Sequence, residues 1–400
     1  MSVLRRYPVF RRLWLARVVS FLGDSLGLVA LIIYVTERSD SGASVGLLLL
    51  AGDFTPALLS PLLGTIADRT DARVAMIGCE LGQAVAVGLI VLTEPPLAVL
   101  LLLVAARSVL AGIFQATSRS IVGELIDDAD LEAANTVIGA GTHGLEALGP
   151  LLAALLLVFI EPRGVLAIDA LTFLVSPLLL AGLPRATAEI AHERLFAGAR
   201  VGLGAIWEHR VVRVISLGFF GVAAFTAVDD VALPFLGTDT FGTGDSGVSL
   251  LYAAGGVGVL IGFALLSRGT RPPVQLALIG FVLASGGNAL TGVAPAIAIA
   301  LAMQAVRGMG NAWIGVGVDT LVQREIPQRV RGRVFANLYG GVGVAAGASY
   351  LVGGALVDVV GPRWVLVGAG TGGLGCAAIA AWVSRSPTTP TPASPTAPSP

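Results

Sequence analysis

Long apolar runs alternate with short polar segments along almost the whole chain. Twelve of these runs are close to the length of about 20 residues that an α-helix needs to cross a bilayer. An isolated strand or loop in hydrocarbon would leave backbone groups without hydrogen-bond partners, so helices are the expected element. The pattern predicts an all-α membrane protein with twelve transmembrane helices, at residues 13–34, 45–66, 74–92, 97–116, 135–160, 165–183, 214–236, 248–266, 274–293, 296–316, 334–357 and 364–383.

The polar segments predict how the chain is divided. The long polar link at 185–213 separates six runs from six, and its apolar residues recur at roughly helical spacing, which indicates a helix lying in the membrane interface. We expect an N-terminal six-helix bundle at 1–184, this linker at 185–213 and a C-terminal six-helix bundle at 214–385. The tail at 386–400 is rich in Pro, Thr and Ser and is expected to be disordered.

An internal repeat supports two related halves. Arg107 in the fourth run and Arg307 in the tenth are each followed by a stretch rich in small residues and then by a polar loop. Equal topology in both halves predicts a parallel repeat about an axis along the membrane normal, with a central site between the bundles.

Composition narrows the class of protein. With 55% hydrophobic and 13% charged residues, the chain has more apolar surface than a water-soluble core can bury. A net charge of -1 and scattered basic residues argue against nucleic acid as a partner. Cys79 and Cys376 each lie inside an apolar run, so we expect no disulfide and no cysteine-based metal site.

The arginines predict the orientation. Of the 25 basic residues, all arginine, three lie within runs and three (Arg38, Arg163 and Arg363) lie on one side of the predicted membrane; the other 19 lie on the opposite side. Because basic residues concentrate in cytoplasmic loops, both termini are expected in the cytoplasm.

Charged residues inside the runs are the candidates for function. Asp24, Asp53, Glu146 and Arg107 come near mid-membrane, where a charge costs about 2.5–3.5 kcal/mol. Our hypothesis is that one carboxylate exchanges a proton while Arg107 keeps a neighbouring carboxylate charged. A static ion pair that fixes the helix register is the alternative, and the sequence does not choose between them.

Two further residues are candidates for the same cavity. His143 lies three residues from Glu146 on one helix face, so the two could share a proton, or the histidine could serve helix packing. Arg307 has no acid in its own run, so pairing across the cavity, contact with an anionic substrate group and a packing role all stay open.

Other acids are expected outside the core site. Glu80, Asp169 and Asp319 lie nearer the ends of their runs, where solvent or neighbouring backbone would satisfy them. Asp229 and Asp230 are expected at the outer mouth of the seventh helix.

Several motifs resemble the major facilitator superfamily over nearly the whole chain. The polar loop after the second run carries Gly64, Asp68, Arg69 and Arg73 in the positions of that family's signature, although Asp71 and Ala72 depart from it. Arg107 fits the buried arginine of proton-coupled members. Gly149-Pro150 resembles the core of the antiporter signature, without its usual surrounding glycines. A short charged turn between two helices can clamp the cytoplasmic side, so Asp68 and Arg69 are expected to act at a gate, with plain anchoring of the arginines on the cytoplasmic side as the alternative. The resemblance implies two halves that rock around a central cavity.

Three stretches, 10–24, 207–213 and 323–333, resemble the bacterial branch that exports siderophores, macrolides and tetracyclines. This resemblance implies a protein of a bacterial cell (inner) membrane that exports a lipophilic or amphipathic small molecule in exchange for protons. Import or facilitated passage of a small metabolite is the alternative, since one fold supports both directions. The expected partners are this substrate, protons and lipid, and we expect a monomer.

Glycine runs at 255–262 and 340–347 invite comparison with nucleotide-binding loops. They lie inside apolar runs and lack both the required spacing and a phosphate-binding lysine, so close helix packing explains them better. No cofactor is therefore expected, and an ion or substrate gradient would drive transport. A membrane-embedded enzyme would need a nucleophile–base pair or a metal cluster, and the sequence shows neither.

Overall fold

The computed structural model describes residues 2–39, 41–55, 71–127, 130–184, 195–266 and 271–385, apart from some side chains at 119–147, 195–199 and 328–329. Every element within these ranges is helical. The elements are α1 (Ser2–Arg6), α2 (Pro8–Ser39), α3 (Gly42–Leu49), the π-helical turn η1 (Leu50–Phe54), α5 (Ala72–Thr93), α6 (Leu97–Ser120), α7 (Val122–Leu125), α8 (Leu131–Leu157), α9 (Pro162–Leu180), α10 (Leu195–Glu208), α11 (Arg210–Thr226), α12 (Asp229–Phe235), the π-helical turn η3 (Leu236–Thr240), α13 (Gly244–Leu266), α14 (Pro273–Gly292), α15 (Ile297–Glu325), α16 (Gln328–Val360) and α17 (Pro362–Arg385).

The helices account for the predicted spans. In the described part of the chain, nine helical segments are long and apolar enough to cross a membrane. Two further spans correspond to α8 and α15, with 27 and 29 residues. The predicted span at 45–66 begins on α3 and η1 and continues outside the described residues. The all-α fold with twelve transmembrane helices is therefore confirmed.

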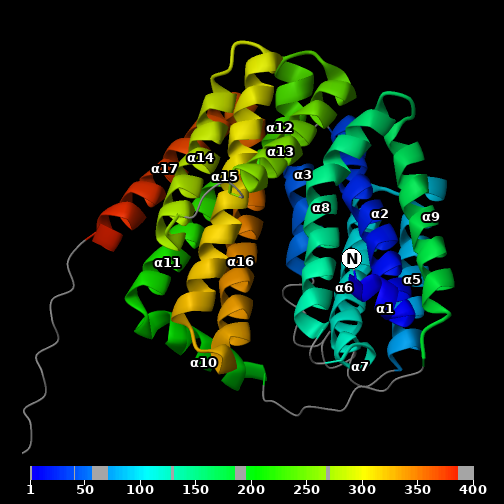
Figure 1. The fold of residues 1–400 in the computed structure, drawn as a ribbon. Helices are drawn as coiled ribbons and strands as arrows, with labels where there is room; N and C mark the ends of the chain where they lie inside the picture. The colour runs from blue at the N-terminus through cyan, green and yellow to red at the C-terminus, as the bar shows by residue number, and fades with distance from the viewer. Residues whose placement is uncertain are drawn as a thin grey trace, which may run out of the picture.

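The same helix pairs pack in both halves, which is the structural form of the internal repeat. In the N-terminal half α2 packs on α9 and α5 packs on both α6 and α9. Their counterparts pack alike in the C-terminal half, where α11 lies on α17 and α14 lies on both α15 and α17. Figure 1 shows the two bundles side by side, with α8 and α13 among the helices that lie between them.

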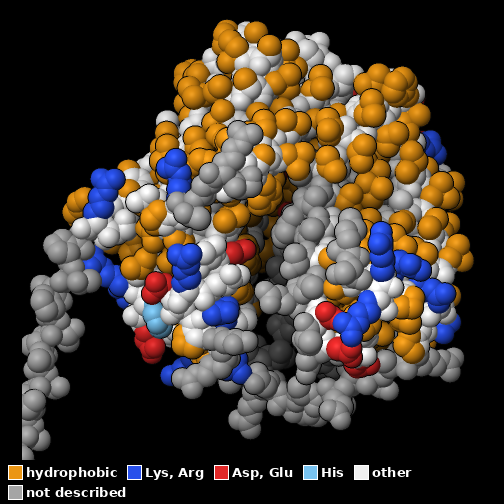
Figure 2. Space-filling model, in the orientation of Figure 1, with side chains coloured by type: hydrophobic (Ala, Val, Ile, Leu, Met, Phe, Trp, Pro, Cys, Tyr) orange, Lys and Arg blue, Asp and Glu red, His pale blue; other side chains and the backbone are white. Residues whose placement is uncertain are grey.

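Among the described residues, the halves share a hydrophobic core at one end of the molecule. The largest core cluster combines Leu31 and Val45 of the N-terminal half with Val231 and Tyr350 of the C-terminal half. The two other clusters each belong to a single half. We call the shared end, uppermost in Figure 1, the closed end. Toward the opposite end Figure 2 shows the surface hollowed between the halves.

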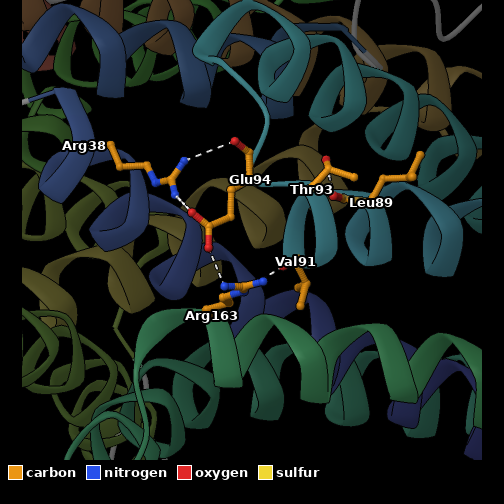
Figure 3. A network of polar contacts seen from close by, with 6 residues as sticks. All are labelled: Arg38, Leu89, Val91, Thr93, Glu94 and Arg163. Carbon is orange, nitrogen blue, oxygen red and sulfur yellow. Dashed lines mark hydrogen bonds and ion pairs between the residues drawn. The ribbon is translucent and has the colours of Figure 1, made fainter.

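A polar network joins three helices of the N-terminal half at the closed end (Figure 3). Glu94, which ends α5 in a left-handed conformation, forms ion pairs with Arg38 of α2 and Arg163 of α9. Arg163 also donates from Nε to the Val91 carbonyl at 2.7 Å. All three charged side chains are about 40% exposed, so each pair contributes at most about 1 kcal/mol.

Candidate functional site

A buried arginine and two carboxylates form the polar centre of the N-terminal half. Arg107 of α6 forms an ion pair with Asp24 of α2, and its guanidinium lies 3.6 Å from the carboxylate of Asp169 on α9. The guanidinium carbon also lies 5.5 Å from the centre of the Phe173 ring. Asp24 and Arg107, both expected near mid-membrane, thus lie together, and Asp169 is a second acid beside them.

The structure corrects the expectation for Asp169 and Glu80, which we placed near helix ends in contact with solvent or backbone. Both are fully buried. Asp169 fits against α2 because Gly23 and Gly27 lie opposite, where any Cβ would overlap its carboxylate. Glu80 accepts a hydrogen bond of 2.9 Å from the hydroxyl of Ser20. Small residues on a neighbouring helix therefore create the space for these acids.

Asp53 reaches the cavity from the wide turn η1. Such π-helical turns often occur at functional sites, because the extra residue redirects a side chain. The Tyr350 hydroxyl of α16 donates to Asp53 Oδ2 at 3.2 Å, so this hydrogen bond connects the two halves. The Asp53 side chain is exposed, and it lines the central cavity.

The C-terminal half contains a second arginine–acid cluster that sequence reasoning missed. Arg307 of α15 forms an ion pair with Asp229, which is fully buried at the start of α12. Asp230 lines the cavity, and its carbonyl accepts a hydrogen bond of 2.7 Å from the Tyr252 hydroxyl. The placement of Asp229 and Asp230 at the outer mouth was therefore wrong, and Arg307 pairs within its own half.

A break in the seventh span explains the second cluster. Helix α11 ends at Thr226, and α12 begins at Asp229 after a short turn. The new helix begins inside the protein, so its first residue, Asp229, meets the buried Arg307, while the next, Asp230, lines the cavity. Two consecutive acids within an apolar run were the available sequence signal.

A central cavity of about 760 Å³ lies between the halves, and four of the residues predicted for it, Asp24, Asp53, Arg107 and Arg307, line it. Its charged lining residues are Asp24, Asp53, Arg107, Asp230 and Arg307. Pro150, in the interior of α8, also lines it, while Gly149 packs against Ser25. A second chamber of about 700 Å³ extends into the C-terminal half and shares Asp230, Arg307 and Asn311 with the first.

Other predicted residues lie outside the described part of the structure or are described away from this cavity. His143 and Glu146 belong to α8, but their side chains are outside the described ones, as are Gly64, Asp68 and Arg69 of the gating motif and the tail. Arg73, the described member of that motif, donates to the Leu183 carbonyl at 3.2 Å. This bond ties α5 to the end of the N-terminal half. Asp319, expected at a helix end, accepts from the Tyr339 hydroxyl at 2.6 Å.

One carboxylate of the C-terminal half caps a helix of the N-terminal half at the closed end. Asp358 of α16 accepts hydrogen bonds from the Ser41 hydroxyl at 3.0 Å and from the backbone N–H of Gly42 and Ala43 at 2.6 and 3.3 Å. A carboxylate there also meets the positive end of the α3 dipole. Gly42 and Gly354 let the backbones of α3 and α16 approach closely, since a Cβ on either would overlap the other helix.

Replacing Asp358 with alanine is expected to favour separation of the halves at the closed end. Loss of an N-terminal cap costs about 1 kcal/mol, which changes the ratio of closed to open molecules about fivefold. Double electron–electron resonance would measure this ratio from the distance between spin labels at Thr93, on α5, and Val293, just after α14. Asp239→Ala is the control, because Asp239 is an exposed acid of the same half without such a bond across the halves. We call the bonds between Asp358 and the start of α3 the Asp358 latch. Unchanged distances in the Asp358 variant would show that these bonds do not hold the closed end together.

Comparison with known proteins identifies the family. Residues 13–337 match the family model of the Major Facilitator Superfamily. Macrolide efflux protein A of Streptococcus pyogenes is 24% identical over 180 residues, which cover 43% of this chain and 44% of that protein. The chain thus spans less than half the length of that relative. The uncharacterized MFS-type transporter YfiS of Bacillus subtilis is 24% identical over 379 residues, covering 88% of this chain and 89% of the relative.

A solved structure shows the same fold at low sequence identity. The nucleoside transporter NupG, in a mutant form, superposes with a TM-score of 0.77 at 14% identity, over 94% of this chain and 100% of the other. The family match, the helix pairs repeated in both halves and the cavity between the halves agree. The chain belongs to the Major Facilitator Superfamily and is a multi-pass membrane protein.

Proposed function

We propose that this membrane protein exports a lipophilic or amphipathic small molecule in exchange for protons. The observation that supports proton exchange is the buried Arg107 with two carboxylates, Asp24 and Asp169, beside the central cavity. Two acids share one arginine, so one of them can take up a proton while the other keeps the guanidinium neutralised.

The two carboxylates differ in access to the cavity, and this difference assigns their roles. The side chain of Asp24 is 26% exposed and lines the cavity, whereas that of Asp169 is fully buried. Asp24 is therefore the group that exchanges a proton with the cavity. Asp169 holds Arg107 in place while Asp24 is neutral. Asp53, Arg307, His143 and Glu146 remain further candidates for coupling or substrate contact.

Alternating access would follow from the unequal ends of the molecule. The shared core and the Asp358 latch close one end, and the surface is hollowed between the halves toward the other. Rocking of the halves around the cavity would break the contacts at the closed end and form new contacts between the halves at the opposite end. Asp68 and Arg69 would act at the gate on that opposite end. In this scheme the halves follow the predicted boundaries, with 185–213 as the link.

The proposed orientation places the closed end outside the cell. Figure 2 shows hydrophobic side chains covering the upper part of the face, while arginines and acids gather in its lower part, near α7 and α10. An excess of arginine marks the cytoplasmic side, so both termini would lie in the cytoplasm of a bacterium with the protein in its cell membrane.

Export is favoured over import by two observations. The walls of both chambers are mainly apolar, and one relative is a macrolide efflux protein. The alternative of a proton-coupled importer or facilitator of a small metabolite is supported by the fold it shares with a nucleoside transporter. Accumulation assays decide between them, since export lowers and import raises the amount of substrate in cells.

Cells that lack their own pumps and express this protein are expected to accumulate less of a fluorescent lipophilic compound, and a protonophore should restore accumulation. Asp24→Asn and Glu146→Gln should each give a folded protein. Loss of the protonophore-sensitive part of export in either variant would identify that residue as a coupling acid. Asp239→Asn, a change at an exposed acid away from the cavity, should export normally. Undiminished proton-driven export by Asp24→Asn would exclude Asp24 as the exchanging group.

A further inference from the structure

We propose that the cavity selects amphipathic organic cations, with the cationic group held between Asp53 and Asp230 and the apolar body held in the C-terminal chamber. This inference rests on the proposed role of the cavity as the transport site and names the chemistry of its substrate. Four observations lead to it: the charge balance of the cavity, the positions of the two acids, the aromatic lining of the second chamber and the absence of a metal site among the described residues.

The charges of the cavity do not balance. Arg107 is matched by Asp24 and by Asp169, and Arg307 forms its ion pair with Asp229. Asp53 and Asp230 line the same cavity, and among the described residues neither has an arginine within ion-pair distance. Arg307 attracts Asp230 at longer range, but its charge is shared with Asp229. The cavity therefore has an excess of negative charge.

The two acids approach the cavity from opposite halves. Asp53 lies on η1 of the N-terminal half and Asp230 on α12 of the C-terminal half, close enough for their charges to interact. The Tyr350 hydroxyl bonded to Asp53 offers a dipole but no charge. Two like charges across a low-dielectric space repel, and a monovalent cation between them relieves that repulsion.

The second chamber supplies the apolar part of the site. It meets the first at Asp230 and Arg307 and continues between aromatic side chains, Phe219, Phe263 and Tyr339. Aromatic rings accommodate hydrophobic groups and also attract cations through their faces. An elongated ligand can thus place its charge at the Asp53–Asp230 pair and its body among these rings.

A metal ion fits the described residues less well than an organic cation. In the described part of the chain no three residues of the types His, Cys, Asp and Glu are grouped so as to hold a metal. Two carboxylates on opposite walls, with apolar surface beside them, suit a large and weakly hydrated ion better than a small hydrated one.

Two ions of equal shape and opposite charge test the proposal. The purified full-length chain in lipid nanodiscs would be dialysed against tetraphenylphosphonium or tetraphenylborate, with empty nanodiscs as the blank. The phosphonium is expected to bind at least about tenfold more tightly than the borate. Asp53→Asn and Asp230→Asn should each weaken phosphonium binding about tenfold, since a charged contact is worth a factor of this order. Phe263→Ala should weaken binding of both ions.

Asp239→Asn removes an exposed acid of the same half and should bind the phosphonium like the unchanged protein. Equal affinity for the two ions, no binding of the phosphonium, or full binding by the Asp53→Asn/Asp230→Asn double variant would each overturn the proposal. Binding needs no proton gradient, so cation binding without proton-driven export would instead contradict the proposed function. Proton-driven export of a neutral compound with no cation preference would contradict this inference alone.

Discussion

Replacing Arg107 with methionine is expected to reduce transport to background and to lower the free energy of unfolding by about 3–5 kcal/mol. The change leaves Asp24 and Asp169 facing each other in the membrane interior without a counter-charge. Both carboxylates would then favour the protonated form, because no guanidinium remains to stabilise either anion. A carboxyl group that stays protonated cannot exchange a proton during the cycle. Proton-driven uptake into inverted vesicles and thermal unfolding would measure the two effects.

A triple variant separates stability from coupling. Arg107→Met combined with Asp24→Asn and Asp169→Asn removes the arginine and both acids, so no unpaired charge remains buried. We expect most of the stability to return, because a neutral replacement of a buried ion cluster is often tolerated, whereas transport should stay absent. Arg38→Met is the matched control, since that arginine is about 40% exposed in the network of Figure 3 and its loss should cost at most about 1 kcal/mol. Normal transport by Arg107→Met would rule out a role for Arg107 in coupling.

The sequence was sufficient to predict the fold and part of the site, because both depend on strong local signals. An apolar run of about 20 residues has few structures open to it other than a transmembrane helix. Charges within such runs are costly, so Asp24, Asp53 and Arg107 could be recognised without a structure. In the structure these three residues line one cavity, and their roles in coupling stay a prediction.

The partners of the buried charges could not be predicted, because they depend on contacts between distant helices. Asp169 is buried because Gly23 and Gly27 lie opposite on α2, and the sequence does not state that these helices are neighbours. Asp229 is buried because the seventh span breaks after Thr226 and starts again inside the protein. In both cases distance from the ends of the apolar run was a poor guide to burial.

The surroundings of the two glycine runs likewise depend on contacts that the sequence does not state. Packing was the prediction for both, and it is correct for the first run, where Gly258 and Gly262 lie against α15. It is wrong for two of the four glycines of the second run, because at Gly340 and Gly343 an added Cβ would meet no described atom within 4 Å. The other two have neighbours: Gly341 lies near Phe220, and Gly347 approaches Leu50 and Phe54 of the other half. Similar sequence patterns thus have different surroundings.

Gly308→Ala is expected to destabilise the protein by about 1–3 kcal/mol or more and to impair transport. A Cβ at position 308 would overlap the backbone carbonyl of Gly255, and one at Gly258 would overlap that of Ala305. These obstacles are backbone atoms of a packed helix, so no side-chain rotation relieves them. Helices α13 and α15 would have to separate, which would also displace the neighbouring Arg307 from Asp229.

Gly315→Ala on the same helix is the control, and the opposite sign is expected for it. An added Cβ there meets no described atom within 4 Å, and alanine is favoured over glycine in a helix interior by about 1 kcal/mol. Thermal unfolding of both purified variants would therefore place Gly308→Ala below the unchanged protein and Gly315→Ala level with it or above. Equal stability of the two variants would show that α13 and α15 do not need backbone contact at Gly308. If Gly308→Ala were destabilised yet transported normally, close packing would support the fold without positioning the Arg307 cluster.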